Sequence, residues 1–575
     1  MKNMNSKMTK RYLIGLSFVL CPLSFSMMVT SCADLMETDS ELVEYEKDNH
    51  LDAPSDSVYS VMGIIYKMQT VADRVVLLGE LRGDLSTTTA SASKDLKAIS
   101  RFEIDTENAY NQISDYYAII NNCNYYLANV QKDLVRHDRK VFEHEYAAVK
   151  AFRAWTYLQL AQIYGEIPLV TEPLLTEDAA QTAMKQNPVD INAICNYFID
   201  DLKPYVDTQL PNYGNINDRP SQKFFIPLRP LLGDLCLWAG RYQEAAQYYH
   251  DYLALRTNPV TTGKQHAYWR DADTKEFRSA TGNISFSGTE CICYIPMESG
   301  KFYGVKSDVT EIFNSTELNK YYAQAAPTKR MRELSAACDF CYVLTKTDGS
   351  LDTLYAPKGN LYKSEYIGDL RFGTVYTKSE STEERFSRVS NVIQSIDKFN
   401  SYGVNLYRVN MVYLRYAEAL NRAGYPQSAF AVLKYGLYPD MVAKHVDSLE
   451  QVKAGTLIDF DVTLFSAENT QGVHSRGCGD AECDTLYAMP QPTAALATRQ
   501  DTIGYQIPLV EDMIINEMAL EGAFEGYRYY DLMRVALRRN DPAYLASPVS
   551  KRDGSEDATL KALLMDKKNW FLPRP

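Results

Sequence analysis

The fold is decided by residues 228–255, which read LRPLLGDLCLWAGRYQEAAQYYHDYLAL. Apolar residues recur at helical spacing on both sides of Gly240, which predicts one helix from Leu228 to Ala239 and a second from Gln243 to Leu255. A small residue at the turn, followed by Ala245 on the second helix, lets two paired helices approach closely. This is the packing of tetratricopeptide-type units, so the stretch predicts a scaffold built from such helix pairs.

The same spacing recurs further along the chain. Gly424 and Ala429 follow a helix predicted from Val412 to Ala423, although the two pairs are not tandem and their match to the repeat is partial. Glu143 to Tyr164 is another long helical pattern, and Gly165 follows it as expected at the end of a helix. Helices therefore dominate the first half of the chain.

Between the helical stretches the composition changes. Residues 256–400 and 440–507 are loop-rich, with short strand-like runs such as Glu290 to Pro296 and Asp339 to Thr345. Loops of this length inside a compact protein are usually functional. Helical periodicity returns from Pro508 to Leu537. The predicted fold class is mainly α, a tetratricopeptide-like scaffold of helix pairs with loop-rich insertions that carry a few short strands.

Composition and charge exclude one class of partner. The chain has 575 residues, 46% of them hydrophobic, which is enough for a large core. The formal net charge is -13 and no stretch is strongly basic, so nucleic acid is not predicted as a partner. Tyrosine is abundant, with 42 residues, and its flat apolar ring with a polar tip suits both helix packing and wet binding surfaces.

The N-terminal segment has the pattern of an export signal. It begins with basic residues, is apolar from 12 to 29, and ends in Val29-Thr30-Ser31-Cys32. Small residues directly before a cysteine resemble the lipobox of bacterial lipoproteins, in which that cysteine is acylated. Lipid attachment is therefore predicted at Cys32, and a plain signal peptide or a short membrane anchor is the alternative. The acidic run at 33–41 resembles a surface-export signal of Gram-negative lipoproteins.

These observations divide the chain into three predicted parts. Residues 1–31 are a signal peptide, 32–55 a lipidated tether and 56–575 a single domain. Within that domain, a helical scaffold and loop-rich insertions on the ligand side alternate. The scaffold is predicted at 56–255, 401–439 and 508–540, and the insertions at 256–400 and 440–507.

The cysteines form three close pairs along the sequence, Cys291/Cys293, Cys338/Cys341 and Cys478/Cys483. Only one pair has the CxxC spacing and the pairs lie far apart, so a zinc site is not predicted. An exported protein meets oxidising conditions, which leaves a local disulfide open for each pair. Three further cysteines fall in helical patterns and are predicted to be packed thiols: Cys123, Cys195 and Cys236.

Four segments, spread over the chain and taken in order behind the lipobox, resemble the SusD/RagB family. They are the helix and exit at 145–170, then 415–421, 516–534 and 570–575. Two further segments, 79–84 and 474–480, resemble the RagB-like side of the family. The resemblance covers essentially the whole chain after Cys32.

The resemblance implies a helical fold with four tetratricopeptide-like pairs and a lipid-anchored position on the outer-membrane surface. It also implies a partner, a SusC-like TonB-dependent transporter, above which the lipoprotein acts as a lid that captures a glycan or, in one branch, a peptide. The charged residues of the motifs lie in predicted helices and are expected to form internal ion pairs and caps: Glu418, Glu521, Arg528, Asp531 and Arg534.

Catalytic constellations are not apparent in the sequence. His144 and Glu145 begin like a zinc-protease helix, but Ala148 stands where the second histidine ligand is needed. The run Gly477-Cys478-Gly479 lacks the rest of a dinucleotide-binding loop. No enzyme activity, cofactor or metal is therefore predicted. A glycosidase with a carboxylate pair is kept as a third alternative, behind glycan binding and RagB-like peptide binding.

A candidate ligand site follows from the four tryptophans. Trp155 and Trp238 fall on apolar helix patterns and are predicted to be core, and Trp570 is predicted to pack the tail down. Trp269 alone lies in a loop-rich insertion, where an aromatic ring either packs locally or stacks on a ligand. Sugars need aromatic platforms flanked by polar groups, so Trp269 is the first predicted platform.

Four other residues complete the predicted site. Tyr268 and Tyr303 are further aromatic platforms in the same insertion. Arg82 and Asp84 are candidate polar contacts, because relatives place ligand groups in the corresponding early loop. The alternative for Arg82 and Asp84 is an ion pair that stabilises a turn.

Overall fold

The computed structural model describes residues 53–255, 288–298, 304–314, 323–338, 341–345, 348–355, 376–381, 391–396, 403–466, 471–479, 487–492 and 498–574, with single positions at 368, 369, 371, 398 and 496. Residues 50–575 form one compact unit, separate from the first 49 residues. The predicted signal peptide, Cys32 and the predicted tether up to residue 52 lie outside the described residues, and α1 begins at Pro54, so its first two residues fall within the predicted tether.

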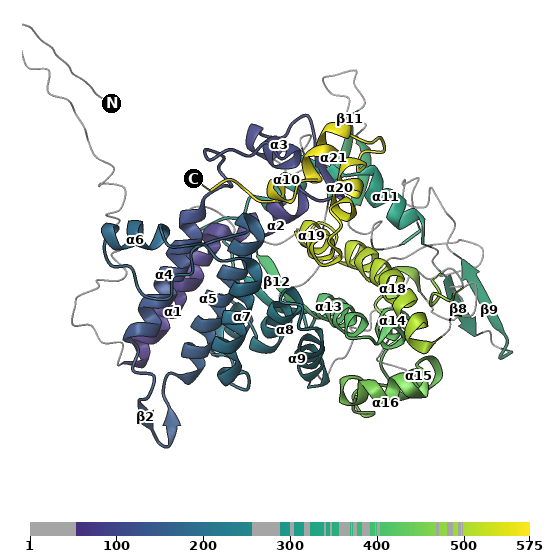
Figure 1. Ribbon diagram of the computed structural model, residues 1–575, viewed down its shortest axis with the longest axis horizontal. Helices are drawn as coiled ribbons and strands as arrows, with labels where there is room; N and C mark the ends of the chain where they lie inside the picture. The colour runs from purple at the N-terminus through teal and green to yellow at the C-terminus, as the bar shows by residue number, and fades with distance from the viewer. Residues whose placement is uncertain are drawn as a thin grey trace, which may run out of the picture. The chain divides into compact units, whose positions relative to one another are not determined.

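The structure is mainly helical, as predicted, and its helices pack in chain order (Figure 1). Neighbours in contact include α4 with α5, α5 with α7, α7 with α8, α8 with α9, α9 with α13, and α13 with α14 and α18. The helices of the first half are α1 (Pro54–Met68), α2 (Ala72–Glu80), α3 (Lys94–Arg101), α4 (Ile113–Asn129), α5 (Glu143–Tyr164), α6 (Glu177–Met184), α7 (Ile191–Leu202), α8 (Leu228–Trp238) and α9 (Tyr242–Ala254).

The second half adds a further set of helices. They are α10 (Val309–Phe313), α11 (Lys329–Ala336), α13 (Val409–Arg422), α14 (Pro426–Lys434), α15 (Pro439–His445), α16 (Ser448–Ala454), α17 (Ser475–Cys478), α18 (Arg499–Glu521), α19 (Arg528–Arg539), α20 (Ala543–Ser550) and α21 (Ala558–Leu564).

The described strands pair two by two, each pair antiparallel. The pairs are β1 (Ser86–Thr88) with β7 (Ala325–Pro327), β2 (Val135–Arg136) with β3 (Arg139–Lys140), β4 (Asn215–Ile216) with β5 (Arg219–Pro220), β6 (Cys291–Ile295) with β12 (Val404–Arg408), β8 (Cys341–Thr345) with β9 (Leu351–Tyr355), and β10 (Tyr376–Ser381) with β11 (Asn391–Ile396). The strand-like runs predicted around 290–296 and 339–345 are thus β6 and β8.

The two predicted helix pairs are confirmed as α8 with α9 and α13 with α14. Gly240 and Gly424 end the first helix of each pair with positive φ angles of 75° and 97°, which a side chain would disfavour. Ala245 and Ala429 are fully buried at the interface of each pair. The small residues therefore do what their spacing predicts, which is to let the paired helices approach closely.

Two predicted boundaries are wrong. The single helix expected from Pro508 to Leu537 is two helices, α18 and α19, separated by a turn at 522–527. Helix α18 starts nine residues before Pro508, at Arg499, where Thr498 and Asp501 form a reciprocal capping box. The region 440–507, expected to be loop-rich, contains α15, α16 and α17.

The expected internal ion pairs of the motif residues are confirmed. Glu418 is fully buried and accepts from Arg534 (Nε to Oε1, 3.0 Å) and from Arg538 (Nη1 to Oε1, 2.9 Å). Arg534 also contacts Asp531 at 2.9 Å, one turn away on α19. These pairs join α13 to α19 inside the core. Because each buried charge has a charged partner, the cost of removing it from water is offset.

A second buried network joins β12 to α18. Arg408 is 1% exposed and contacts Glu290 and Glu521 at 2.7 Å each and Glu525 at 2.7 Å. Arg371 contacts Glu517 at 2.7 Å and Glu521 at 2.9 Å. Both arginines therefore hold parts of the long insertion against the helical scaffold.

The C-terminal segment closes back on the first helices. Trp570 is fully buried, as its predicted role requires, and its carbonyl accepts from Arg82 (3.0 Å) and Tyr529 (2.8 Å). The backbone N–H of Leu572 donates to the carbonyl of Ile163 at the end of α5 (2.9 Å). The last described residues thus bridge α2, α5 and α19.

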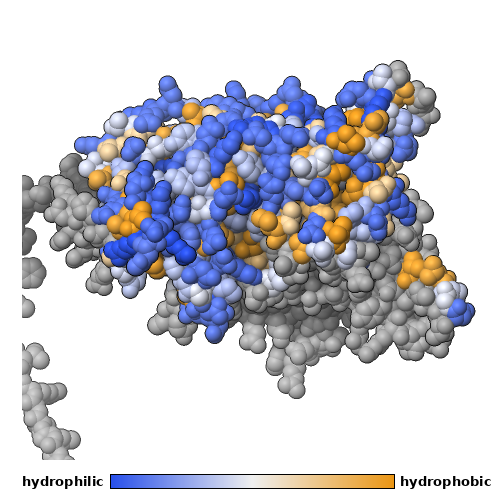
Figure 2. Space-filling view, turned by 90° about the horizontal axis from the view of Figure 1, so that it is seen from below, coloured by the Kyte–Doolittle hydropathy of each residue, from blue (hydrophilic) through white to orange (hydrophobic). Residues whose placement is uncertain are grey.

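Among the described helices, none combines the length and apolarity that a membrane crossing requires. On the face drawn in Figure 2, hydrophilic residues predominate and apolar residues gather in small groups between them. Small scattered apolar groups are normal on a water-exposed protein surface.

Candidate functional site

The described part of the chain contains a cleft where α5, α8, β12, α13 and α19 meet. Its cavity volume is about 50 Å³, which is room for a few water molecules. Its lining combines aromatic rings, charged groups, carboxamides and a few aliphatic side chains. The lining residues are Val75, Trp155, Leu158, Gln159, Gln162, Asp234, Leu237, Trp238, Leu406, Tyr407, Arg415, Gly526, Tyr527, Tyr530, Asp531 and Arg534.

Helical periodicity explains why these residues share one cleft. On α5, Trp155, Gln159 and Gln162 are spaced four and three residues apart and so lie on one face. On α8, Asp234 and Trp238 are four apart. The cleft is thus formed by the facing sides of helices that the scaffold already brings together.

One wall of the cleft is fixed by Asp234. Its carboxylate accepts from the Nη1 of Arg415 (2.7 Å), the hydroxyl of Tyr407 (2.7 Å) and the hydroxyl of Tyr249 (2.5 Å). Burial raises the pKa of Tyr407 and of Tyr249, so both phenols stay protonated and donate. The guanidinium of Arg415 lies over the ring of Tyr527, 5.2 Å from its centroid. With three donors engaged, Asp234 positions the wall and is poorly placed to act as a general acid.

A second charged group lies beside an indole, Trp238, one turn along α8 from Asp234. The guanidinium of Arg534 lies 5.5 Å from the ring of Trp238 and contacts Asp531 at 2.9 Å. Burial raises the pKa of Asp531, although Arg534 counteracts this shift. Gln159 donates from Nε2 to the Oε1 of Gln162 at 3.1 Å. The cleft therefore places aromatic rings beside polar groups, but its volume as it stands admits water and not a sugar ring.

Two of the predicted site residues lie inside the core. Arg82 is 1% exposed and donates to the carbonyl of Leu78 (2.8 Å), the carbonyl of Trp570 (3.0 Å) and the hydroxyl of Tyr530 (3.1 Å). Its guanidinium also lies 4.2 Å from the ring of Tyr529. Arg82 thus does not line the cleft itself, but its hydrogen bond holds Tyr530, which is a lining residue.

Asp84 is fully buried and pairs with Arg528, which donates from Nε to Oδ1 (2.6 Å) and from Nη2 to Oδ2 (2.9 Å). The Arg528 guanidinium holds the pKa of Asp84 below its usual range in spite of burial. The ion-pair alternative therefore describes Asp84 well, with Arg528 rather than Arg82 as its partner. Direct ligand contact by Arg82 or Asp84 stays a prediction and requires exposure of groups that are engaged in this structure.

The aromatic platforms Trp269, Tyr268 and Tyr303 lie outside the described residues. Of the tryptophans predicted to be core, Trp155 is buried at 3% exposure, whereas Trp238 is half-buried at the cleft. Sequence reasoning missed Trp238 because most residues of α8 are apolar. The sequence signal for Trp238 is Asp234, which lies one turn away on the same face of α8. A carboxylate beside an indole on one helix face indicates a surface that is not purely core.

Comparison with known proteins identifies the fold. No family model and no curated protein matches the sequence. Among solved structures, a SusD-like carbohydrate binding protein from Bacteroides fragilis NCTC 9343 has a TM-score of 0.54 at 14% identity, covering 85% of this chain and 88% of that one.

Two structures from Bacteroides vulgatus ATCC 8482 agree. A SusD superfamily protein has a TM-score of 0.55 at 15% identity, covering 90% of this chain and 95% of that one. A SusD-like carbohydrate binding protein has a TM-score of 0.50 at 15% identity, covering 84% and 83%. The chain therefore has the SusD-like fold over most of its length, as its motifs indicate.

Proposed function

We propose that this chain, whose fold is that of the SusD-like proteins, is a surface lipoprotein that captures an oligo- or polysaccharide without transforming it. The single observation that carries the proposal is the likeness of fold to proteins described as carbohydrate binding, over more than four fifths of both chains. The absence of a transformation is supported by the cleft, where the Asp234 carboxylate is engaged by Arg415 and so is not free for acid–base chemistry.

The delivery step completes the proposal. A lipid on Cys32 anchors the protein at the outer membrane, and the captured glycan passes to a SusC-like TonB-dependent transporter. The support for this part is the charged, apolar and small-residue pattern that ends at Cys32, together with the acidic residues behind it. A peptide ligand of the RagB kind is the competing outcome, and released sugar products would indicate a glycosidase.

Ligand binding is tested by calorimetry with defined glycans and peptides, on the wild type and on Trp269→Ala. We expect a glycan to bind and Trp269→Ala to weaken it by roughly ten-fold to a hundred-fold, as for other stacked aromatic anchors. Tyr59→Ala is the matched control, because Tyr59 is 71% exposed on α1, outside the cleft lining. Unchanged affinity in Trp269→Ala, with loss in Trp238→Ala at an unchanged melting temperature, would move the site to the described cleft.

Anchoring is tested by fractionating cells that express the wild type or Cys32→Ala. We expect the wild type in the outer-membrane fraction, and mild-detergent extraction should recover it with a large β-barrel protein. Cys32→Ala should leave the membrane fraction, because a single export signal without acylation provides no anchor. Normal amounts of Cys32→Ala in the outer membrane would contradict the lipoprotein assignment.

A further inference from the structure

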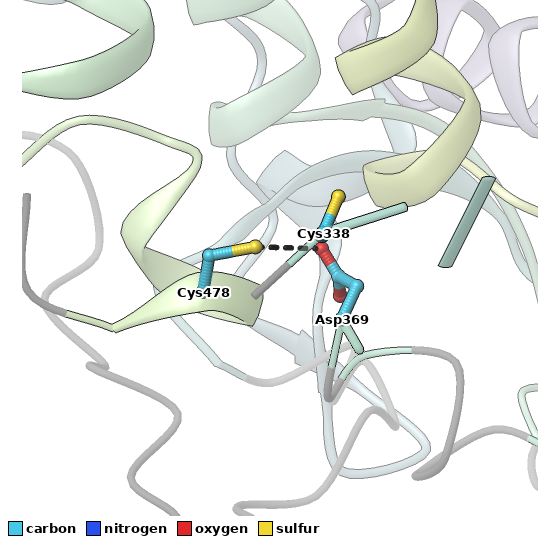
Figure 3. A group of neighbouring side chains, drawn as sticks. All are labelled: Cys338, Asp369 and Cys478. Carbon is cyan, nitrogen blue, oxygen red and sulfur yellow. Dashed lines mark hydrogen bonds between the residues drawn. The ribbon is translucent and has the colours of Figure 1, made fainter. Parts of the chain in front are cut away.

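Two cysteines that are distant in sequence meet beside a buried carboxylate (Figure 3). The Sγ atoms of Cys338 and Cys478 and a carboxylate oxygen of Asp369 all lie within 4.8 Å of one another. Cys338 follows α11, whereas Cys478 ends α17. In Figure 3 the sulfur of Cys478 points toward Asp369 and Cys338. The two thiols are 140 positions apart, which is 478 minus 338.

Backbone contacts bring Asp369 and Cys338 together. Asp369 donates its N–H to the carbonyl of Ser335 in α11 (2.9 Å), and the Ser335 hydroxyl donates to the carbonyl of Asp369 (3.1 Å). A Cβ on Gly368 would lie 2.3 Å from the carbonyl oxygen of Cys338, so this approach requires a glycine. The segment at 368–369 is thereby fixed against the end of α11.

A second glycine brings the other cysteine to the same place. A Cβ on Gly477 would lie 2.1 Å from the Oδ1 of Asp369. The Sγ of Cys478 donates to the Oδ2 of Asp369 at 3.5 Å. Three chain segments therefore pack at distances that only glycines allow, and the cysteines are adjacent as a result.

The charges at this point disfavour a metal ion. Arg371 holds both oxygens of Asp369, from Nε to Oδ1 at 3.0 Å and from Nη2 to Oδ2 at 2.6 Å. The positive guanidinium would have to be displaced before Asp369 could bind a cation. Among the described residues the cluster supplies three ligands, whereas structural zinc sites take four.

We propose that Cys338 and Cys478 form a disulfide bond in the exported protein. This pairing rests on the export that the proposed function requires, since disulfides persist in oxidising compartments. The bond replaces the local pairs Cys338/Cys341 and Cys478/Cys483 that sequence spacing leaves open. It closes a loop that contains the later part of the 256–400 insertion together with α13, α14, α15 and α16, and it ties α11 to α17.

The oxidant is a protein disulfide of the thiol-oxidase class. Cys338 is half-buried even in the finished fold, whereas Cys478 falls to 1% exposure, so Cys338 is the more accessible thiol throughout folding. Its thiolate attacks the oxidant first and releases one of the oxidant's thiols. The thiolate of Cys478 then attacks the Sγ of Cys338 and releases the second thiol. The two cysteines lose two electrons and two protons, and the oxidant's disulfide is reduced to a dithiol.

The bond forms most readily before the core closes. Burial raises the pKa of Cys478, which lowers the fraction of reactive thiolate once this residue is packed. The sulfurs must also approach to about 2.05 Å, which requires a rotation of the Cys338 side chain. Oxidation is therefore expected during folding rather than after it.

The test is a map of thiols in the full-length protein extracted from its native membrane. Free thiols are alkylated without reduction, and the digest is searched for a peptide linking Cys338 to Cys478, about 2 Da lighter than the two reduced peptides together. Cys338→Ser and Cys478→Ser should abolish the linked peptide. Cys123→Ala is the control that should retain it, because Cys123 lies buried on α4, outside the cluster.

A second sample separates the pairing from export. Purified protein is reduced and then refolded with oxidised glutathione. A link in both samples supports the proposal. A link after refolding alone supports the geometry and contradicts the proposed export. Alkylated Cys338 and Cys478 in both samples, a peptide linking Cys338 to Cys341 or Cys478 to Cys483, or one equivalent of bound zinc would each overturn it.

Discussion

The Gly79→Ala substitution is expected to lower the free energy of unfolding by at least about 3 kcal/mol, at or beyond the upper end of ordinary overpacking in a core. A Cβ at this position of α2 would lie 1.7 Å from the carbonyl oxygen of Gly526 and 2.6 Å from its carbonyl carbon. Both contacts are with backbone atoms, which cannot rotate away as a side chain can. The turn between α18 and α19 would have to leave α2.

Gly63→Ala is the matched control. Gly63 also lies inside a helix, α1, but a Cβ there meets nothing within 4 Å. Alanine favours a helix over glycine by about 0.5–1 kcal/mol, so this variant should be as stable as the wild type or slightly more so. Chemical denaturation of both variants measures the difference. Equal midpoints for Gly79→Ala and Gly63→Ala would show that α2 does not pack on this turn.

The Glu418→Gln substitution is expected to cost about 3 kcal/mol at neutral pH, as for other buried ion pairs that lose one partner. It removes the charge that Arg534 and Arg538 both contact, while the two guanidinium groups stay largely buried. The guanidinium groups hold the pKa of Glu418 at about 2, well below its ordinary value of 4.5, despite the opposing effect of burial.

The same shift sets a pH window. Because the folded state binds the Glu418 proton more weakly than the unfolded state, the contribution is present in full above pH 4.5 and is lost as the pH falls toward 2. The difference in free energy of unfolding between the wild type and Glu418→Gln should therefore become smaller across that pH range. Glu333→Gln is the control, because Glu333 is half exposed in its pair with Lys329, and its loss should cost less than about 1 kcal/mol. A gap between wild type and Glu418→Gln that does not change from pH 7 to pH 3 would rule out this assignment.

Local periodicity was sufficient to place α5 and the first helix of each pair, α8 and α13. The predicted helix at 143–164 and α5 have the same bounds, because 22 residues of consistent spacing leave no competing pattern. The start of α18 was missed because Pro508 reads as a helix boundary. In the structure Pro508 lies inside α18, and hydrogen bonds from Asn421 to the carbonyl of Ile507 and from Arg539 to the carbonyl of Pro508 support the helix there.

The candidate site was less accessible from the sequence, because it depends on contacts between distant segments. Trp238 looks like a core residue until α5 and α19 are placed opposite it. Asp84 pairs not with its sequence neighbour Arg82 but with Arg528, which lies 444 positions away. Cys338 meets Cys478 through two glycine contacts that no spacing rule describes. Pairwise spacing reports local structure, whereas these sites are made by tertiary packing.

The bridge from the last residues to the first helices has a consequence for biogenesis. Ribosomes and secretion channels deliver a chain from its N-terminus, at rates of about 5–20 residues per second during synthesis. The carbonyl of Trp570 accepts a hydrogen bond from Arg82, and the N–H of Leu572 donates one to the carbonyl of Ile163. Arg82 and Ile163 are synthesised hundreds of residues before Trp570 and Leu572. Both contacts can therefore be in place only after residue 572 has been made. The order of synthesis thus places the closure of this part of the core among the late steps of folding.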